Sequence, residues 1–450
     1  MNPMPPHSLW PDPDALGPMT DLYELTMMAG YYAAGMASQR ATFELFVRRM
    51  PDRRAFLVFA GLEQAIGDLL KLAFSPDQFE SIRRWPQFRH VDETVMDAIA
   101  MLRFDGDVWS VPEGTIVFPG ETLVRVTAPL PQAQWVETHL LASLAYPTLV
   151  ASKAARVVAA AAGRSLFEFG ARRGHGPLAG MLAARAAYIA GFTGTSHVEA
   201  ARRLGIPASG TMAHSWVQSF GTESEAFATF ARIFPENTTL LVDTYDTADG
   251  VRHAAAIEPP VQAIRIDSGD LAHEARQART ILDQLGRSSV KIIASGDLDE
   301  FKIAHLVGSG APVDGFGVGT ELVTSRDAPA LAMVYKLVEL EGQGKFKLSS
   351  GKRTYPMTKQ VFRRRDQNSR FCGDHVTEAL ESAEGEPLLI PILRSGRLVN
   401  GLPTLEDIRV RCRDQLAALP ERLLGLDAQP DYPITYSEAL EARGRSLMKS

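Results

Sequence analysis

Seven short apolar runs, each ending in small or polar residues, constrain the fold of this chain more than any other feature. They stand mostly ~20–30 residues apart, the length of one strand–helix unit, and a helix-like segment follows each run. No hairpin pattern separates them, so the series favours a β/α barrel, with an open doubly wound sheet as the competing architecture. The runs end in FEFGARR (167–173), GFTGTS (191–196), ASGTMAH (208–214), LLVDTYD (240–246), AIRIDSGD (263–270), IIASGD (292–297) and GFGVGTE (315–321).

The flanking sequence predicts a second domain, because 450 residues exceed one ordinary core. After a proline-rich lead-in of ~18 residues, the spacing predicts a helix over 20–32 with Thr20 or Asp21 as its N-cap. Alternating β-formers and turn residues predict a small antiparallel sheet over 107–129. The tail reads as hairpin material over 335–364 and a final helix pair around Ile408–Leu424. We therefore expect an N-terminal α+β domain (1–145), a barrel (146–340) and a C-terminal segment packing back on the first domain (341–450).

Composition excludes several classes of protein. The net charge of −6 argues against a general nucleic-acid binder, which would normally carry a basic domain. No run approaches the ~18–20 apolar residues of a membrane span, and no signal peptide is recognised at the start. Cys372 and Cys412 lack CxxC spacing and are expected to be unpaired thiols. Together these features predict a cytoplasmic protein.

His214 is the first candidate for chemistry. It lies in GTMAH, where a run ends and a helix would begin, and a histidine there can act as a nucleophile or an acid/base group. Asp243 and Asp246 follow the next run and are candidates to accept a hydrogen bond from one imidazole nitrogen. The alternative is a histidine with a purely structural role. The polar residues at the neighbouring run ends favour a functional histidine over this alternative.

Arg265 and Asp267 occupy alternate positions of one predicted strand, so both side chains should face the barrel interior. An inward arginine suits a carboxylate or phosphate, which its planar fork can bind with two hydrogen bonds. A buried ion pair that only stabilises the barrel is the alternative.

Two glycine-rich run ends suggest a phosphate site. ASGDLDE (294–300) and GFGVGTE (315–321) should be adjacent in a barrel, whose last strands commonly bind phosphate through backbone amides. Arg172 and Arg173, at the first run end, would suit an anion or a solvated surface. Residue chemistry alone thus indicates a barrel enzyme acting on a phosphorylated, carboxylated small molecule near a histidine.

The same run ends, in this order, resemble the nicotinate phosphoribosyltransferase family. The resemblance adds TDLYELTM (20–27), ASGTMAHS, DGFGVGTELVTS and YKLVE, covers most of 18–340, and continues weakly into KRTYPMTKQVFR. It implies the irregular β/α barrel of type II phosphoribosyltransferases with a sandwich-like α+β domain built from both chain ends. It also implies a homodimer with the active site near the subunit interface. Met357 departs from the family, which commonly has glycine there, and we expect this to alter a turn and not the chemistry.

The resemblance implies a role for each matching residue. His214 would be the histidine that ATP transiently phosphorylates, with Asp243 as its orienting carboxylate. Tyr23 would stack on the pyridine ring from the neighbouring subunit, and Arg265 would meet the nicotinate carboxylate. The remaining nicotinate contacts would be Phe169, Arg172, Ser196 and Thr211, and phosphoribosyl pyrophosphate would meet Asp267, Gly296, Gly317, Gly319 and Thr320.

The implied reaction joins nicotinate to phosphoribosyl pyrophosphate, with ATP as co-substrate in a ligase-type reaction. Magnesium would accompany the ATP and pyrophosphate groups, and the sequence assigns it no protein ligands. The close relative, nicotinamide phosphoribosyltransferase, has an aspartate where this chain has Ser196, and a carboxylate there would repel nicotinate. Ser196 therefore favours the acid substrate. A catalytically silent nucleotide-binding homologue is a further alternative, which the presence of His214, Asp243, Arg265 and Thr320 disfavours.

Overall fold

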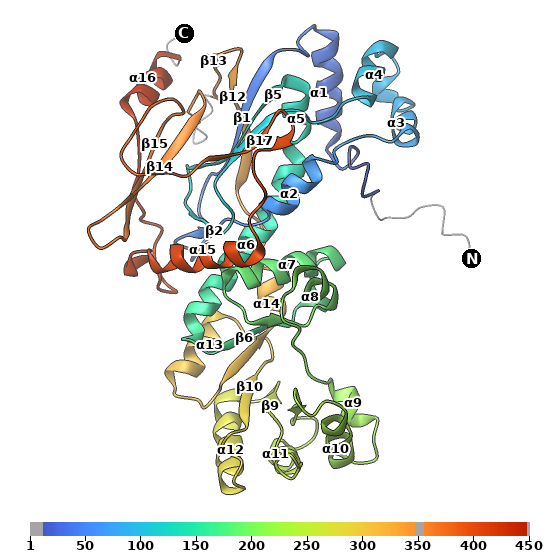
Figure 1. Cartoon of the computed structure of the whole chain (residues 1–450), viewed down its shortest axis with the longest axis vertical. Coiled ribbons are helices and arrows are strands. Elements are labelled where there is room, and N and C mark those ends of the chain that lie inside the picture. Colours follow the sequence, from blue (N-terminus) through green and yellow to red (C-terminus); the bar gives the residue numbers. More distant parts are fainter. Residues whose placement is uncertain (1–11, 348–354, 448–450) are drawn as a thin grey trace.

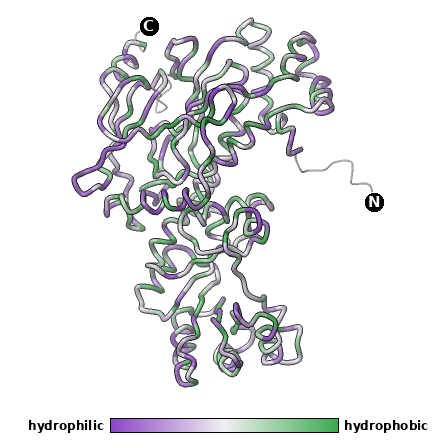
Figure 2. Tube along the Cα trace, in the orientation of Figure 1, coloured by the Kyte–Doolittle hydropathy of each residue, from purple (hydrophilic) through white to green (hydrophobic). Residues whose placement is uncertain are grey.

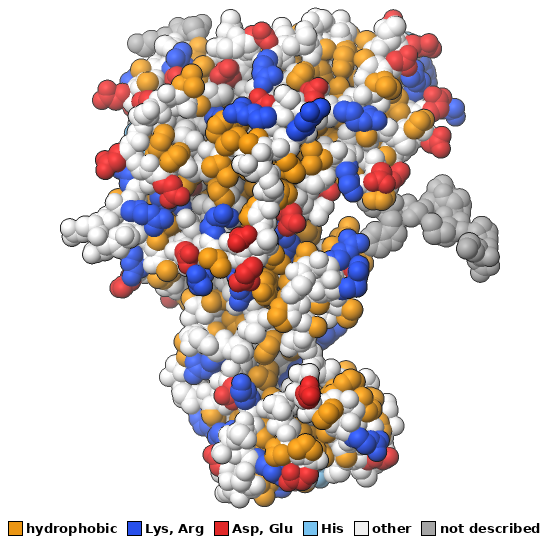
Figure 3. Space-filling view, in the orientation of Figure 1, with side chains coloured by type: hydrophobic (Ala, Val, Ile, Leu, Met, Phe, Trp, Pro, Cys, Tyr) orange, Lys and Arg blue, Asp and Glu red, His pale blue; other side chains and the backbone are white. Residues whose placement is uncertain are grey.

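A computed structural model describes residues 12–347 and 355–447 of the chain. Most of the proline-rich lead-in, and residues 348–354 of the predicted hairpin, lie outside this part. Figure 1 shows two bodies: an upper one built from both chain ends, and a lower one built from the middle of the chain. A narrow waist separates the two in the space-filling view of Figure 3, where basic and acidic side chains are interspersed on both.

The lower body contains a curled, six-stranded parallel sheet in the order β7-β6-β11-β10-β9-β8. Six of the seven predicted runs contain its strands, which confirms the irregular barrel-like class of fold. The seventh run, 208–214, forms no strand and makes one bridge, between Ala208 and Thr195. The strands are β6 (Ser165–Glu168), β7 (Gly194–Thr195), β8 (Thr239–Leu241), β9 (Ala263–Ile266), β10 (Lys291–Ala294) and β11 (Gly315–Val318).

Helices follow these strands, and several aspartates at the run ends cap them. Asp246, Asp270 and Asp299 each accept a hydrogen bond from a backbone amide in the first turn of the next helix. Such caps satisfy amides that have no partner inside the helix, which fixes where the chain turns. The helices of this body are α7 (Pro177–Ala190), α8 (Val198–Leu204), α9 (His214–Gln218), α10 (Glu223–Ile233), α11 (Thr247–Ala255), α12 (Leu271–Gln284), α13 (Glu300–Gly308) and α14 (Thr320–Val323).

The upper body is built around a seven-stranded sheet in the order β13-β12-β1-β5-β3-β17-β18. Strands from both ends of the chain pair within it, because β12 lies beside β1 and β17 lies beside β3. The strand β12 thus lies in this sheet, although the boundary predicted at 340 groups it with the barrel. The bounds are β1 (Arg40–Val47), β3 (Asp107–Ser110), β5 (Thr122–Pro129), β12 (Met333–Leu340), β13 (Gln343–Gly344), β17 (Ile390–Arg394) and β18 (Arg397–Leu398), and β2 (Leu57–Val58) pairs with β4 (Ile116–Val117).

A second sheet, in the order β16-β14-β15-β19, packs against the first. Buried Lys359 lies between them, because its Nζ is 2.8 Å from the Glu44 carboxylate and its carbonyl accepts a hydrogen bond from Arg125. The hydrophilic tip of the β14–β15 hairpin projects from this sheet (Figure 2). The strands are β14 (Lys359–Arg365), β15 (Phe371–Glu378), β16 (Glu386–Pro387) and β19 (Ile434–Tyr436).

The remaining helices of the upper body lie at its two chain ends. The predicted pair around Ile408–Leu424 is one helix, α15, followed by a short 3-10 turn, because Pro420 cannot continue the helix. A further helix, α16, ends the described chain. The helices are α1 (Leu22–Ala33), α2 (Leu62–Leu69), α3 (Pro76–Arg83), α4 (Glu93–Ala100), α5 (Leu130–Trp135), α15 (Leu405–Ala417) and α16 (Glu438–Leu447).

The long helix α6 (Glu137–Ala161) joins the two bodies. Leu140 and Leu144 belong to the apolar core of the upper body, whereas Val150 and Ala154 belong to the second core. The predicted boundary between residues 145 and 146 therefore falls inside a continuous helix. No helix among the described residues, α6 included, is both long enough and apolar enough to cross a membrane.

Candidate active site

A cavity of about 1120 Å³ opens at the carboxyl ends of the parallel strands. The unpaired run 208–214 forms one of its walls, and β6, β7 and β9 supply others. This arrangement brings together seven of the residues that the sequence predicted for the site. They are Phe169, Arg172, Ser196, Thr211, His214, Arg265 and Asp267.

Arg265 is the most highly bonded side chain of this cavity. Its Nη2 lies 2.5 Å from the Asp267 carboxylate, its Nε donates to Ser295 Oγ at 2.7 Å, and its Nη1 donates to Thr211 Oγ1 at 3.3 Å. Ser295 also donates to Asp267 at 2.5 Å. The ion pair holds the Arg265 guanidinium in a fixed position. Because Arg265 still lines the cavity, this fixed guanidinium offers positive charge to a ligand.

Phe169 forms an apolar platform beside this cation. The Arg265 guanidinium carbon lies 5.5 Å from the centre of the Phe169 ring, within cation–π range. The ring also lies against Gly317, where an added Cβ would lie 2.5 Å from a ring carbon. Gly317 is thus required for the close approach of β11 to the platform.

Glu168 connects two walls of the cavity through hydrogen bonds of its buried carboxylate. The carboxylate is fully buried and accepts hydrogen bonds from the Gly170 amide and from Thr195 Oγ1, both at 2.5 Å. Burial raises its pKa, and the two hydrogen bonds oppose that effect. Since Gly170 precedes Arg172 and Thr195 precedes Ser196, this one carboxylate positions both of the loops that carry those residues.

His214 is the first residue of α9, and its imidazole Nδ1 lies 3.1 Å from the Thr244 hydroxyl. The sequence pointed instead to Asp243 or Asp246 as the hydrogen-bond partner, and neither pairs with the imidazole in this structure. Asp246 caps α11, while Asp243 Oδ2 accepts hydrogen bonds from Ser268 Oγ at 2.6 Å and the Asp267 amide at 3.0 Å. The physical reason is local: Asp246 caps a helix and Asp243 holds the strand-end turn through Oδ2, whereas the Thr244 hydroxyl lies within reach of Nδ1.

Of the residues predicted to meet phosphoribosyl pyrophosphate, Asp267 lines the cavity, whereas the glycines and Thr320 lie beside it without lining it. Gly296 has φ +100° and approaches Asp267 so closely that an added Cβ would lie 2.1 Å from its carbonyl oxygen. Gly319 also approaches Phe169 closely, because an added Cβ would lie 3.1 Å from the Phe169 carbonyl oxygen. Thr320, the next residue, begins α14. The glycines thus allow the last two strand ends to meet the Arg265–Asp267 cluster.

Tyr23 lies elsewhere, on α1 of the upper body, and does not line the cavity of its own chain. Its side chain is 45% exposed, together with the apolar neighbours Met19, Leu22 and Met27. Burial of the phenol and the nearby Glu137 carboxylate raise its pKa.

The described residues contain no group of three or more His, Cys, Asp or Glu side chains that could hold a metal ion. One carboxylate atom at the site nevertheless has no partner: Asp243 Oδ1 is buried and forms no hydrogen bond. A buried acceptor of this kind normally meets a donor or a cation.

Sequence reasoning missed three residues of this site: Glu168, Thr244 and Ser295. Each lies within a run that was recognised, FEFGARR, LLVDTYD and IIASGD. A glutamate between two phenylalanines was a signal for a buried, bonded carboxylate. Thr244 and Ser295 gave no distinct signal, because small hydroxyl side chains are common at strand ends.

Comparisons with known proteins show the family to which this chain belongs. Family models described as the nicotinate phosphoribosyltransferase N-terminal domain, family and C-terminal domain match residues 19–145, 165–381 and 375–442. A nicotinate phosphoribosyltransferase of Mycobacterium tuberculosis is 46% identical over 94% of this chain and 91% of its own length. The enzyme of that name from Bacillus subtilis is 37% identical over 94% of both chains. The crystal structure of human nicotinic acid phosphoribosyltransferase superposes with a TM-score of 0.84 at 28% identity, covering 96% of this chain and 100% of that one. The chain belongs to the nicotinate phosphoribosyltransferase family.

Proposed function

We propose that this protein transfers the 5-phosphoribosyl group of phosphoribosyl pyrophosphate to nicotinate, the first step of NAD synthesis from nicotinate. The ring nitrogen of nicotinate forms a bond to C1 of the ribose as the bond from C1 to pyrophosphate breaks. The products are nicotinate mononucleotide and pyrophosphate. The observation that carries the proposal is the cavity in which Arg265, Phe169 and Ser196 meet.

The cavity suits an aromatic carboxylate. Phe169 offers a flat apolar face to a pyridine ring, and Arg265 beside it offers guanidinium donors to the carboxylate. Arg172 is exposed on the 3-10 turn Ala171–Arg173, and Ser196 brings a hydroxyl without negative charge. Because nicotinate and phosphoribosyl pyrophosphate are both anionic, a cavity lined by Arg172, Arg202 and Arg265 suits holding them in position for transfer.

We further propose that His214 accepts the γ-phosphoryl group of ATP. In the tautomer with the proton on Nδ1, that N–H donates a hydrogen bond to the Thr244 hydroxyl. The lone pair of Nε2 is then free to attack the γ-phosphorus, and ADP leaves. Water later hydrolyses the phosphohistidine to histidine and phosphate. His214 lines the same cavity as Arg265, which supports coupling between the two reactions.

Magnesium would enter with the phosphates of ATP and phosphoribosyl pyrophosphate, neutralising their charge. It characteristically keeps several waters and binds proteins through one or two carboxylates. Two carboxylates are candidates for this role: Asp267, which lines the cavity, and Asp243, whose Oδ1 has no partner.

We also propose that the protein works as a homodimer in the cytoplasm. Tyr23 is outside the cavity of its own chain, so it can reach a pyridine ring only in a second subunit. The exposed apolar side chains around it on α1 suit a subunit interface. Two free cysteines in the described chain fit a reducing compartment.

A direct assay tests the function. The purified protein is incubated with nicotinate, phosphoribosyl pyrophosphate, ATP and Mg2+, and nicotinate mononucleotide and ADP are measured. Absence of product from a protein that still binds these ligands would instead identify a silent homologue. Equal turnover of nicotinamide in place of nicotinate would favour the amide-specific alternative.

The histidine assignment has its own test. His214→Ala should lose the acid-labile phosphoenzyme formed from [γ-32P]ATP. Persistence of that phosphoenzyme in the variant would refute the assignment while leaving phosphoribosyl transfer itself untouched.

A further inference from the structure

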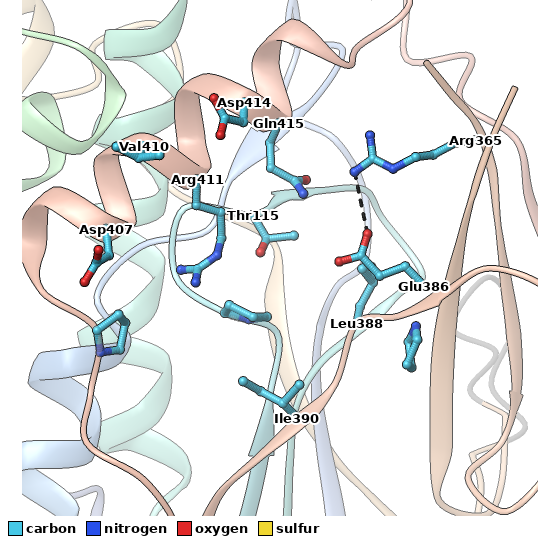
Figure 4. Close-up of a pocket in the computed structure, with 13 residues that line it drawn as sticks. Thr115, Arg365, Glu386, Leu388, Ile390, Asp407, Val410, Arg411, Asp414 and Gln415 are labelled. Carbon is cyan, nitrogen blue, oxygen red and sulfur yellow. Dashed lines mark ion pairs between the residues drawn. The ribbon is translucent and has the colours of Figure 1, made fainter. Parts of the chain in front are cut away.

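A second cavity, of about 700 Å³, lies in the upper body and shares no lining residue with the candidate active site. It is enclosed by α15, by the turn that leads from β3 to β4, and by the strands β14, β16 and β17. Figure 4 shows Thr115, Arg411 and Gln415 gathered on one side of this cavity, with Arg365 and Glu386 opposite.

Two buried polar side chains form the floor of this cavity. Gln415 is 9% exposed, and its Oε1 accepts hydrogen bonds from Arg363 Nη1 at 3.0 Å and from the Ile116 amide at 3.4 Å. These bonds fix the orientation of the amide, so its Nε2 is left without a protein partner. Thr115 is 2% exposed, and its hydroxyl likewise makes no hydrogen bond within the described chain. Neither donor atom is among the buried, unpartnered polar atoms of the described chain, so both are accessible from the cavity. This floor is therefore suited to receive an acceptor from outside the chain.

Arg411 adds positive charge at the same place. Its Nη1 donates to the Glu113 carbonyl at 2.9 Å, which holds the guanidinium beside Thr115 and leaves Nη2 for a ligand. The anchor Arg363 is itself rigid, because it is fully buried and ion-paired with Asp374 at 2.6 Å. The donors of the floor are therefore held in position before any ligand arrives.

The walls and the rim define the rest of the ligand. Aliphatic and proline side chains cover much of the wall, including Leu388, Ile390 and Val410. The rim carries Asp407, Asp414 and Glu386, the last of which pairs with Arg365 at 3.6 Å. Three carboxylates at the entrance disfavour polyanions such as nucleoside triphosphates, whereas a single carboxylate on an apolar body avoids most of that repulsion.

We propose that this cavity binds a small monocarboxylate with an apolar body, its carboxylate on Thr115, Gln415 and Arg411. The ligand would exclude water from the aliphatic wall and satisfy the donors of the floor. The proposal does not depend on the reaction at the barrel, since no residue is shared between the two cavities.

The test measures binding of hexanoate by titration calorimetry to the full-length protein without nicotinate, and variants of the second cavity show where hexanoate binds. Thr115→Val is isosteric and removes a hydroxyl that has no partner, so it should fold normally and bind hexanoate about tenfold more weakly. Arg411→Met keeps the aliphatic stem and should weaken binding by at least about tenfold. Arg445→Met, at an exposed arginine of α16 that pairs with Glu441 and does not line the cavity, is the control and should bind like wild type.

Hexanol, which lacks the carboxylate, should bind at least about tenfold more weakly than hexanoate. The proposal is overturned if hexanoate fails to bind at millimolar concentration. Equal binding of hexanoate by Thr115→Val and wild type overturns it as well, and this variant decides the matter if Arg411→Met proves unstable.

Discussion

The Nδ1 atom of His214 lies 3.1 Å from the hydroxyl of Thr244, whereas the carboxylate of Asp243, one residue earlier, is bonded to Ser268 and to the Asp267 amide. The hydroxyl can accept a hydrogen bond from protonated Nδ1, and in that tautomer Nε2 carries no proton. Asp243 would then act on the histidine indirectly, by holding the strand-end turn that carries Asp267.

Removing the hydroxyl in Thr244→Val should therefore slow formation of the phosphoenzyme by about tenfold, the effect of one lost hydrogen bond on a barrier. Thr244→Ser should restore most of the rate, because it keeps the hydroxyl. Rapid-quench measurement with labelled ATP gives the rate. A normal rate in Thr244→Val, together with loss of the phosphoenzyme in Asp243→Asn, would show that the carboxylate is the working partner.

Replacing the buried carboxylate in Glu168→Gln should loosen both loops of the nicotinate pocket. The amide has one acceptor oxygen where two donors, from Gly170 and Thr195, now bind, so about 1–3 kcal/mol of local stabilisation is lost. We expect the KM for nicotinate to rise more than kcat falls. Glu80→Gln, at an exposed carboxylate on α3 of the upper body, is the control and should leave both constants unchanged. A fall in kcat alone would place the effect of Glu168 on the chemical step.

Introducing charge in Ser196→Asp should turn specificity away from nicotinate. The new carboxylate would face the substrate carboxylate across a partly solvated cavity, costing about 1–3 kcal/mol, or roughly ten- to hundredfold in kcat/KM. Ser196→Asn has nearly the same shape without the charge and should lose much less. The ratio of kcat/KM for nicotinate over nicotinamide is the measurement. If both variants change this ratio equally, the electrostatic explanation is wrong.

The two thiols should differ in reactivity. Both cysteines are free, as predicted, but Cys372 is exposed whereas Cys412 is buried on α15. Burial raises the pKa of Cys412 to about 12, so the thiol stays protonated, and unreactive, at neutral and mildly alkaline pH. Iodoacetamide at pH 8 should thus modify Cys372 alone in the native protein, and both thiols after denaturation, as read by mass spectrometry of peptides. Labelling of native Cys412 would show that α15 opens readily.

Periodicity and run spacing were sufficient to predict the parallel strands, and the alternation of Arg265 and Asp267 predicted that both would reach one cavity. These are local properties, because a strand directs every second side chain to the same face. The missing strand at 208–214 could not be predicted in this way. Its pattern resembles that of the other runs, and only the space left between β7 and β8 decides that it forms a wall.

The sequence by itself determined the class of fold, the list of strand-end residues and, through ordered motifs, the family. The tertiary structure decided which side chains form hydrogen bonds with each other. Thr244, and not Asp243, lies beside His214. Ser295 bridges Arg265 and Asp267, and Glu168 bonds to two loops of the cavity. It also decided that Tyr23 lies on α1 of the upper body and does not line the active-site cavity of its own chain. The physical reason is that hydrogen-bond partners depend on which side chains are brought within about 3 Å by packing of distant segments. Spacing along a chain determines faces and periods, whereas such distances are determined only when strands, turns and helices pack together.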